Sequence, residues 1–158
     1  MKTQNTPSLP SPILSYGLVF LQFFCIGFLT FQLDWLAVIQ ASPWPLLIMG
    51  LALFIGLWAL WHLKPLGFNI IPDPHESCQL CQQGPYRWIR HPMYAAILLF
   101  FWSAVLTQPS TPLIWGLIIL LTIVLLIKLH YEEKRLLQKL PHYAHYQQHS
   151  HKLIPFIF

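Results

Sequence analysis

Long apolar runs without a charged residue dominate this sequence and restrict the folds that are open to it. The longest covers residues 91–127, which contain no Asp, Glu, Lys or Arg. A single helix of that length would measure about 55 Å, whereas the core of a bilayer is about 30 Å thick. The polar segment QPSTP at 108–112 interrupts the run, so we expect a helical hairpin with spans near Pro92–Thr107 and Pro112–Lys128. Each span would begin with a proline, which the first turn of a helix tolerates.

Two further apolar runs precede this hairpin. Ile13–Leu33 and Leu46–Leu63 are each long enough to cross a membrane as a helix. Only 9% of all residues are charged, against roughly 25% in an ordinary soluble domain, and 56% are hydrophobic. This composition excludes a soluble globular domain and a module that binds nucleic acid. We predict an all-α integral membrane bundle of about four transmembrane helices, with residues 1–12 as a disordered leader and 13–158 as a single domain.

The basic residues lie on one predicted side of the membrane. Four spans place the leader, the loop at 64–90 and the segment after the fourth span together. All nine Lys and Arg residues fall on that side or at its boundary: Lys2, Lys64, Arg87, Arg90, Lys128, Lys134, Arg135, Lys139 and Lys152. Because basic residues concentrate in cytoplasmic loops, the chain is predicted to be multi-pass with both termini in the cytoplasm.

The predicted hairpin brings distant polar residues together. Its antiparallel spans would place Arg90 and His91 beside Tyr131, Glu132 and Glu133, at the boundary between membrane and cytosol. Such a cluster suits a polar ligand with an anionic and a cationic end. Two simpler interpretations remain open: the basic pair is a membrane anchor, or the acidic pair begins an exposed helix with weak salt bridges.

Other potential metal ligands give weaker patterns. Cys78 and Cys81 have the spacing of a metal or redox pair, but no second such pair follows. Four histidines near the end of the chain lie close to helical spacing, which is typical of a solvated tail: His142, His145, His149 and His151. We therefore predict no metal site.

A series of motifs in the second half of the chain is more specific. It begins with Gly84-Pro85-Tyr86-Arg87-x-x-Arg90-His91-Pro92-Met93-Tyr94 and continues with Tyr131-Glu132-Glu133 and Tyr143-x-x-Tyr146. Over residues 64–158 the sequence resembles the isoprenylcysteine carboxyl methyltransferase family. The Arg-His-Pro-x-Tyr core also occurs in phospholipid methyltransferases and, in similar form, in sterol reductases.

This resemblance implies an integral-membrane methyltransferase that uses S-adenosylmethionine, with its cofactor-binding part at about 64–158. The acceptor would be hydrophobic or lipidated and enter from the lipid bilayer, in the first place a carboxylate such as prenylcysteine. Arg90 would pair with the cofactor's carboxylate, and it and Glu133 are the candidate catalytic residues. The candidate cofactor-binding residues are Tyr86, Arg87, Arg90, His91, Pro92, Tyr94, Glu132 and Glu133. Among the candidates, Tyr86, Arg87 and Tyr143 rank second.

Three alternatives remain open. The acceptor could be a phospholipid amine or a thiol instead of a carboxylate. The chain could be a nicotinamide-dependent membrane reductase that shares the Arg-His-Pro-Tyr pocket, although it has no GxGxxG fingerprint. It could also be a non-catalytic membrane subunit, which would bind no cofactor.

The predicted topology can be tested with reporter fusions. Fusions after Lys64 and at the C-terminus should both report the cytoplasm, because the basic residues lie on that side, and a fusion after Trp35 should report the opposite side. A C-terminus found outside the cytoplasm would contradict the hairpin and the orientation together.

Overall fold

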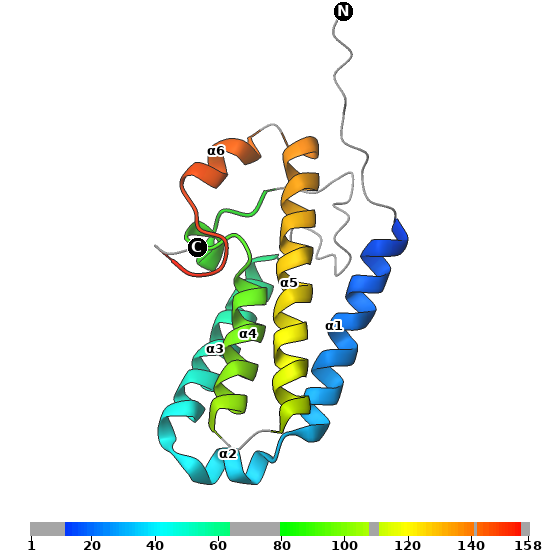
Figure 1. The fold of residues 1–158 in the computed structure, drawn as a ribbon. Helices are drawn as coiled ribbons and strands as arrows, with labels where there is room; N and C mark the ends of the chain where they lie inside the picture. Colours follow the sequence, from blue (N-terminus) through cyan, green and yellow to red (C-terminus); the bar gives the residue numbers. More distant parts are fainter. Residues whose placement is uncertain (1–11, 64–79, 108–110, 141, 156–158) are drawn as a thin grey trace, which may run out of the picture.

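A computed structural model describes residues 12–63, 80–107, 111–140 and 142–155 of the chain, and these residues are mostly helical (Figure 1). The described part contains no β-strand, and its one isolated bridge joins Ile89 to His151 in parallel. The helices are α1 (Pro12–Gln32), α2 (Trp35–Ala41), α3 (Pro43–Leu63), α4 (Pro92–Thr107), α5 (Pro112–Lys139) and α6 (Tyr143–Gln148), with a 3₁₀ turn η2 (Gly84–Arg87) before α4.

The four long helices form an elongated bundle in which α4 and α5 are central. Helix α3 packs along α4, α4 along α5, and α5 along α1, as Figure 1 shows. In the most apolar 18-residue stretch of each helix, 44% of the residues of α5 are buried, compared with only 17% of the residues of α3. Helices α1, α3 and α5 are long and apolar enough to cross a membrane, and α4 is a shorter apolar helix of 16 residues. This confirms the predicted helical membrane bundle.

Helix boundaries follow the sequence signals closely, with three differences. The predicted span at Pro92–Thr107 coincides with α4. Helix α2 was not expected; it is a short helix whose first turn is capped by Asp34, which accepts a hydrogen bond from the Ala37 amide at 3.1 Å. Helix α3 begins three residues before the predicted Leu46, because proline is tolerated in a first turn.

The third difference concerns the acidic pair. Helix α5 continues to Lys139 instead of ending near Lys128, so Glu132 and Glu133 lie well inside a helix. The interpretation of these residues as an exposed helix start is therefore wrong. No proline or glycine interrupts the sequence between 117 and 140, and the next proline, at 141, lies directly after the end of the helix.

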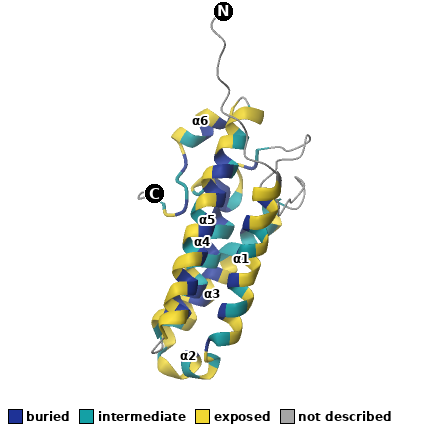
Figure 2. Cartoon of the chain, turned by 45° about the vertical axis from the view of Figure 1, so that its right-hand side comes forward, coloured by how far each residue is buried: buried dark blue, intermediate teal, exposed yellow. Residues whose placement is uncertain are grey.

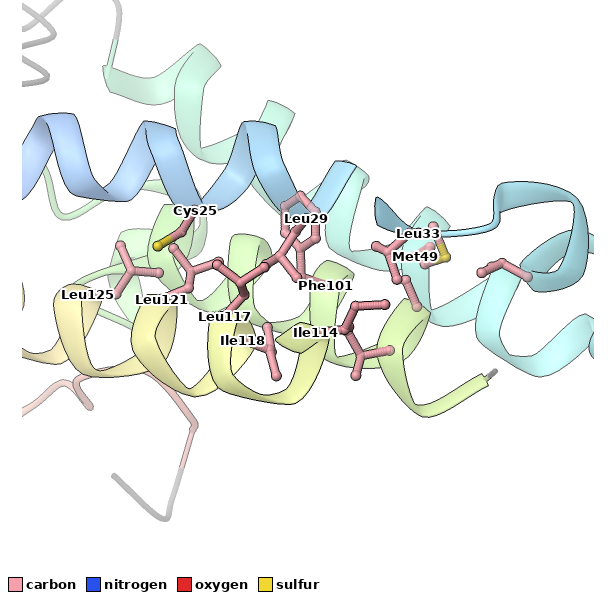
Figure 3. Packing of buried hydrophobic residues seen from close by; sticks show 13 residues of the cluster. Cys25, Leu29, Leu33, Met49, Phe101, Ile114, Leu117, Ile118, Leu121 and Leu125 are labelled. Carbon is pink, nitrogen blue, oxygen red and sulfur yellow. The ribbon is translucent and has the colours of Figure 1, made fainter. Parts of the chain in front are cut away.

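The apolar core lies in the half of the bundle away from the charged residues. Figure 3 shows side chains of α1, α4 and α5 packed together there, with Met49 from α3 at one end. Large hydrophobic side chains cover much of the outside of the bundle, where Figure 2 shows exposed residues along the helices. An apolar exterior of this kind is what a lipid environment requires.

Small residues allow α3 and α4 to approach closely. Ala52 is almost fully buried, and a Cβ built on Gly56 would lie 3.5 Å from the Cβ of Ala96. The sequence pair Ala52-x-x-x-Gly56 thus marks a helix-packing contact, as such pairs often do in membranes.

Ionisable groups collect at one end of the bundle. Every described Lys and Arg lies toward the end where α4 begins and α5 finishes, whereas Asp34 lies at the opposite end beside α2 (Figure 1). The predicted leader at 1–11, Lys2, Lys64 and Cys78 lie outside the described residues. One end of the bundle is thus set apart for polar chemistry.

Gly84 provides a test of the turn that leads into this end. Its φ is +58°, and an added Cβ would lie 2.7 Å from the ring of His62. We expect Gly84→Ala to lower the free energy of unfolding by at least about 1–2 kcal/mol, because a left-handed conformation is strained for alanine. Denaturant titration in mixed micelles would measure the change. Gly116→Ala is the matched control and should not destabilise the protein, because a Cβ added at Gly116 would contact no neighbouring side chain or backbone within 4 Å. An equal loss for both variants would contradict this account.

Candidate functional site

The segment before α4 is held against the end of the chain by backbone hydrogen bonds. A residue that precedes proline favours an extended backbone, and His91 precedes Pro92. The amide of Arg90 donates to the His151 carbonyl at 2.7 Å, and the amide of His91 to the Lys152 carbonyl at 3.1 Å. These bonds fix the position of the Arg90 and His91 side chains where α4 begins.

Arg90 joins this segment to α5 and to the segment after α6. Its Nε donates to Oε1 of Glu133 at 2.6 Å, and both side chains are less than a tenth exposed. Its Nη1 donates to the carbonyl of Gln147 at 3.2 Å and to the carbonyl and hydroxyl of Ser150. One buried guanidinium thus connects three parts of the chain that are remote in sequence.

His91 lies between the two carboxylates of α5. Its Nδ1 is 3.5 Å from Glu132 and its Nε2 is 3.6 Å from Glu133. Burial disfavours the charged imidazole, but the neighbouring negative charges of Glu132 and Glu133 outweigh burial and raise the pKa of His91. His91 is therefore held toward its protonated form, and its Nε2 has no hydrogen-bond partner among the described residues.

Tyr94 and Lys128 extend the cluster toward the membrane. The hydroxyl of Tyr94 donates to Glu132, and its ring stacks on His91 with the centroids 5.5 Å apart. The Lys128 Nζ lies 5.3 Å from the centre of the same ring and donates to Oε1 of Gln22 in α1 at 2.6 Å. Lys128 is 1% exposed, so its ammonium is stabilised by an amide oxygen and an aromatic face rather than by water.

Two buried tyrosines of α6 lie near the cluster, and they differ in whether their hydroxyl groups have a hydrogen-bond partner. Tyr146 donates its hydroxyl to the carbonyl of Tyr86, and burial raises its pKa to about 12, so it remains a protonated donor. Tyr143 is 1% exposed, and no hydrogen-bond partner for its hydroxyl occurs among the described residues. Burial and the nearby charge of Glu133 raise the pKa of Tyr143 well above its ordinary value.

The structure brings most of the predicted site residues together and leaves one outside. Arg90, His91, Tyr94, Glu132 and Glu133 form one connected cluster, and Pro92 is buried at its edge. Tyr86 is buried beside it against Ala59 and Cys81. Arg87 is exposed and lies 6.0 Å from the ring of Trp88, which is itself half exposed.

Sequence analysis missed several members of this cluster, above all Lys128 and Gln22. The sequence analysis places Lys128 at the membrane boundary, but the residue lies within the apolar helix α5. A charged residue within such a helix is usually functional or paired. Gln22 is likewise a strongly polar side chain within an apolar run, and this is a signal that could have indicated the pair. The contacts of Ser150 and of the Gln147 carbonyl had no sequence signal.

The Cys78–Cys81 pattern cannot be followed in full because Cys78 lies outside the described residues, and the described histidines of the tail do not gather around a common point. Cys81 is buried, and its thiol points to the His62 carbonyl at 3.8 Å. The rings of His145 and His149 contact each other at a tilted angle with their centroids 4.6 Å apart, and both residues are exposed. No group of three or more potential ligands occurs among the described residues.

Comparison with known protein families identifies a match over most of the chain. A family model described as phospholipid methyltransferase matches residues 40–144, a range that includes Arg90, His91, Lys128 and both glutamates. A comparison with curated proteins gives no significant match.

The buried Lys128–Gln22 contact can be tested by a double-mutant cycle. Gln22→Leu should lower the free energy of unfolding by about 1.5–3 kcal/mol, because it removes a hydrogen bond to a buried charge. Lys128→Met in the same chain should recover much of that loss, since no ammonium is then left unpaired. Unfolding in mixed micelles measures both effects. Gln40→Leu, which changes an exposed glutamine, is the control and should be neutral. A double variant no more stable than Gln22→Leu would rule out the coupling.

Proposed function

Because this chain belongs to the phospholipid methyltransferase family and is a membrane methyltransferase, we propose that it transfers methyl groups from S-adenosylmethionine to a hydrophobic acceptor. The proposal rests on one observation above all. Two buried polar atoms, His91 Nε2 and the Tyr143 hydroxyl, lack hydrogen-bond partners among the described residues and lie within the same charged cluster. Buried polar groups are rarely left unpaired, so the cluster is suited to a polar ligand.

The chemical character of the cluster fits this donor. S-adenosylmethionine carries a carboxylate, an ammonium and a sulfonium, and the cluster offers cationic and anionic side chains within a few ångströms of each other. When bound, S-adenosylmethionine supplies an activated methyl group, which passes to the acceptor as the carbon–sulfur bond breaks and its electron pair stays on sulfur. The protein must then mainly orient the reactants and exclude water.

The residues have different roles in this proposal. Glu132 is the more accessible of the two carboxylates, with a side chain 19% exposed, and would hold an ammonium or hydroxyl group of the donor. His91 Nε2 and the Tyr143 hydroxyl would donate hydrogen bonds to oxygen or nitrogen acceptors of S-adenosylmethionine. Arg90 already donates through Nε and Nη1 to the chain itself, so we assign it to positioning Glu133 and the segment after α6, instead of to pairing with the donor's carboxylate.

The preferred acceptor is a carboxylate on a hydrophobic molecule, such as prenylcysteine. Such an acceptor is ionised at neutral pH and needs no general base. Each possible base of the cluster among the described residues is already engaged: Glu133 is paired with Arg90, Glu132 accepts from Tyr94, and His91 is held toward its protonated form. The cationic groups would also attract an anionic acceptor.

A phospholipid amine is the second candidate acceptor, because the matching family is described as phospholipid methyltransferase. An ammonium would have to lose a proton before it could attack the methyl group. Glu132 is the group best placed to accept that proton, since its side chain is partly exposed.

Binding of the product S-adenosylhomocysteine tests the proposed donor. Glu132→Gln and Tyr143→Phe should each weaken binding by about 1.5–3 kcal/mol in calorimetry of the detergent-purified protein, because each would remove a hydrogen bond to the ligand that involves a charged group. Tyr143→Phe should not lower stability, because its hydroxyl has no partner in the described structure, whereas Tyr146→Phe should. His149→Ala is the exposed control and should bind normally. Binding of NADPH in place of S-adenosylhomocysteine would instead favour the reductase alternative.

The pH dependence of turnover distinguishes the acceptors. With a carboxylate acceptor and saturating reactants, turnover should be nearly flat from about pH 6.5 to 8.5, because a free carboxyl has a pKa of about 3.5. With an amine or a thiol, turnover should rise with pH, by up to about tenfold per unit below the pKa of the acceptor. A steep profile on an amine, with no methylation of any acid, would overturn the carboxylate proposal and leave the family assignment intact.

A further inference from the structure

One positively charged side chain is buried in the interface between α1 and α5. The Nζ of Lys128 donates to Oε1 of Gln22, and no carboxylate among the described residues lies within ion-pair distance of it. Two apolar side chains of similar volume are often at least as stable as a buried polar pair of this kind. Stability alone therefore does not explain why α5 carries a charge at this position, and we looked for a role in the charged cluster.

The ammonium of Lys128 contacts the cluster through an aromatic ring. It lies 5.3 Å from the centre of the Tyr94 ring, and the Tyr94 hydroxyl donates to Glu132. The ring of His91 stacks on Tyr94 almost in parallel, with an angle of 4° between the two rings. A cation near an aromatic ring is attracted to its electrons, and it makes the hydroxyl of a phenol a stronger hydrogen-bond donor. Tyr94 is thus held both at its ring and at its hydroxyl.

Tyr94 in turn restrains the orientation of a carboxylate. One oxygen of Glu132 accepts the hydrogen bond from Tyr94, and the other lies 3.5 Å from Nδ1 of His91. In the proposed function Glu132 holds an ammonium or hydroxyl group of the donor. A binding group that is already fixed in the required orientation loses less conformational entropy when the ligand arrives, and it therefore binds more tightly.

We propose that Lys128 is a positioning residue for donor binding. Held in place by Gln22, it keeps the Tyr94 hydroxyl on Glu132 and so orients that carboxylate. The inference rests on the proposed binding of S-adenosylmethionine at the charged cluster. It also gives α1 a part in the site, although this helix lies outside residues 40–144, which the family model matches.

A variant without either buried polar group separates this role from a structural one. Gln22→Leu combined with Lys128→Met leaves no buried charge unpaired, so it should fold, and denaturant titration in mixed micelles checks this. Its dissociation constant for S-adenosylhomocysteine, measured by calorimetry, should rise about tenfold, the effect of one hydrogen bond to an ionised group. Lys128→Arg keeps a cation beside the ring and should stay within about threefold of the unaltered protein.

Ser15→Ala is the matched control for this variant. It also removes a buried hydrogen bond between α1 and α5, from Ser15 to the hydroxyl of Tyr131 at 2.8 Å. This bond does not involve Tyr94 or Lys128, so the variant should bind S-adenosylhomocysteine as the unaltered protein does.

Tyr94→Phe tests the link itself, because it keeps the ring and removes the hydroxyl. It should weaken binding of S-adenosylhomocysteine by about tenfold as well. When it is combined with Gln22→Leu and Lys128→Met, little further loss is expected, since all these changes break the same link to Glu132.

Three outcomes would overturn the inference while the proposed function stands. The first is unchanged affinity in the Gln22→Leu/Lys128→Met variant. The second is tighter binding by that variant, which would mean that the ammonium of Lys128 only opposes the ammonium of the ligand. The third is a fully additive loss with Tyr94→Phe, which would mean that the two residues act independently. If the unaltered protein does not bind S-adenosylhomocysteine, the proposed function fails and the inference fails with it.

Discussion

The buried ion pair between Arg90 and Glu133 is the contact on which the charged end of this protein depends. Its atoms are 2.6 Å apart, and both side chains are almost fully removed from solvent. Loss of one partner from such a pair typically costs about 3–5 kcal/mol, because the other charge is left buried and unpaired. Since Arg90 also donates to Gln147 and Ser150, the same guanidinium holds the segment after α6 over α5. The positions of His91 and Tyr143 follow from this arrangement.

Helix α5 organises both the membrane part and the polar part of the molecule. Its 28 residues span about 42 Å, more than the about 30 Å of a bilayer core, so one continuous helix carries the apolar core and the acidic pair. Lys128 and Glu132 are four residues apart and share a helix face, with Tyr94 of α4 in contact with both. The cluster thus passes from a buried ammonium to carboxylates near the membrane surface through a single aromatic ring.

Apolar and polar contacts meet along one short segment. Pro85, Trp88 and Ile89 line an apolar groove together with Ile55 and Trp58 of α3, and the next residues, Arg90 and His91, lie in the charged cluster. Gly84 makes this possible, since its positive φ and the closeness of His62 leave no space for a side chain.

The sequence alone determined the fold class, the approximate spans and which candidate site residues lie together. Uncharged runs of sufficient length permit few structures other than membrane helices, and an antiparallel hairpin necessarily brings residues 90–91 to residues 131–133. The tertiary structure decided which atoms of these residues are engaged. It placed Arg87 at the surface, directed Arg90 toward Glu133 and the carbonyls of Gln147 and Ser150, and paired Lys128 with Gln22 across 106 positions. Periodicity and spacing describe one element at a time, whereas these contacts depend on how separate helices pack and on which polar groups burial forces to find a partner.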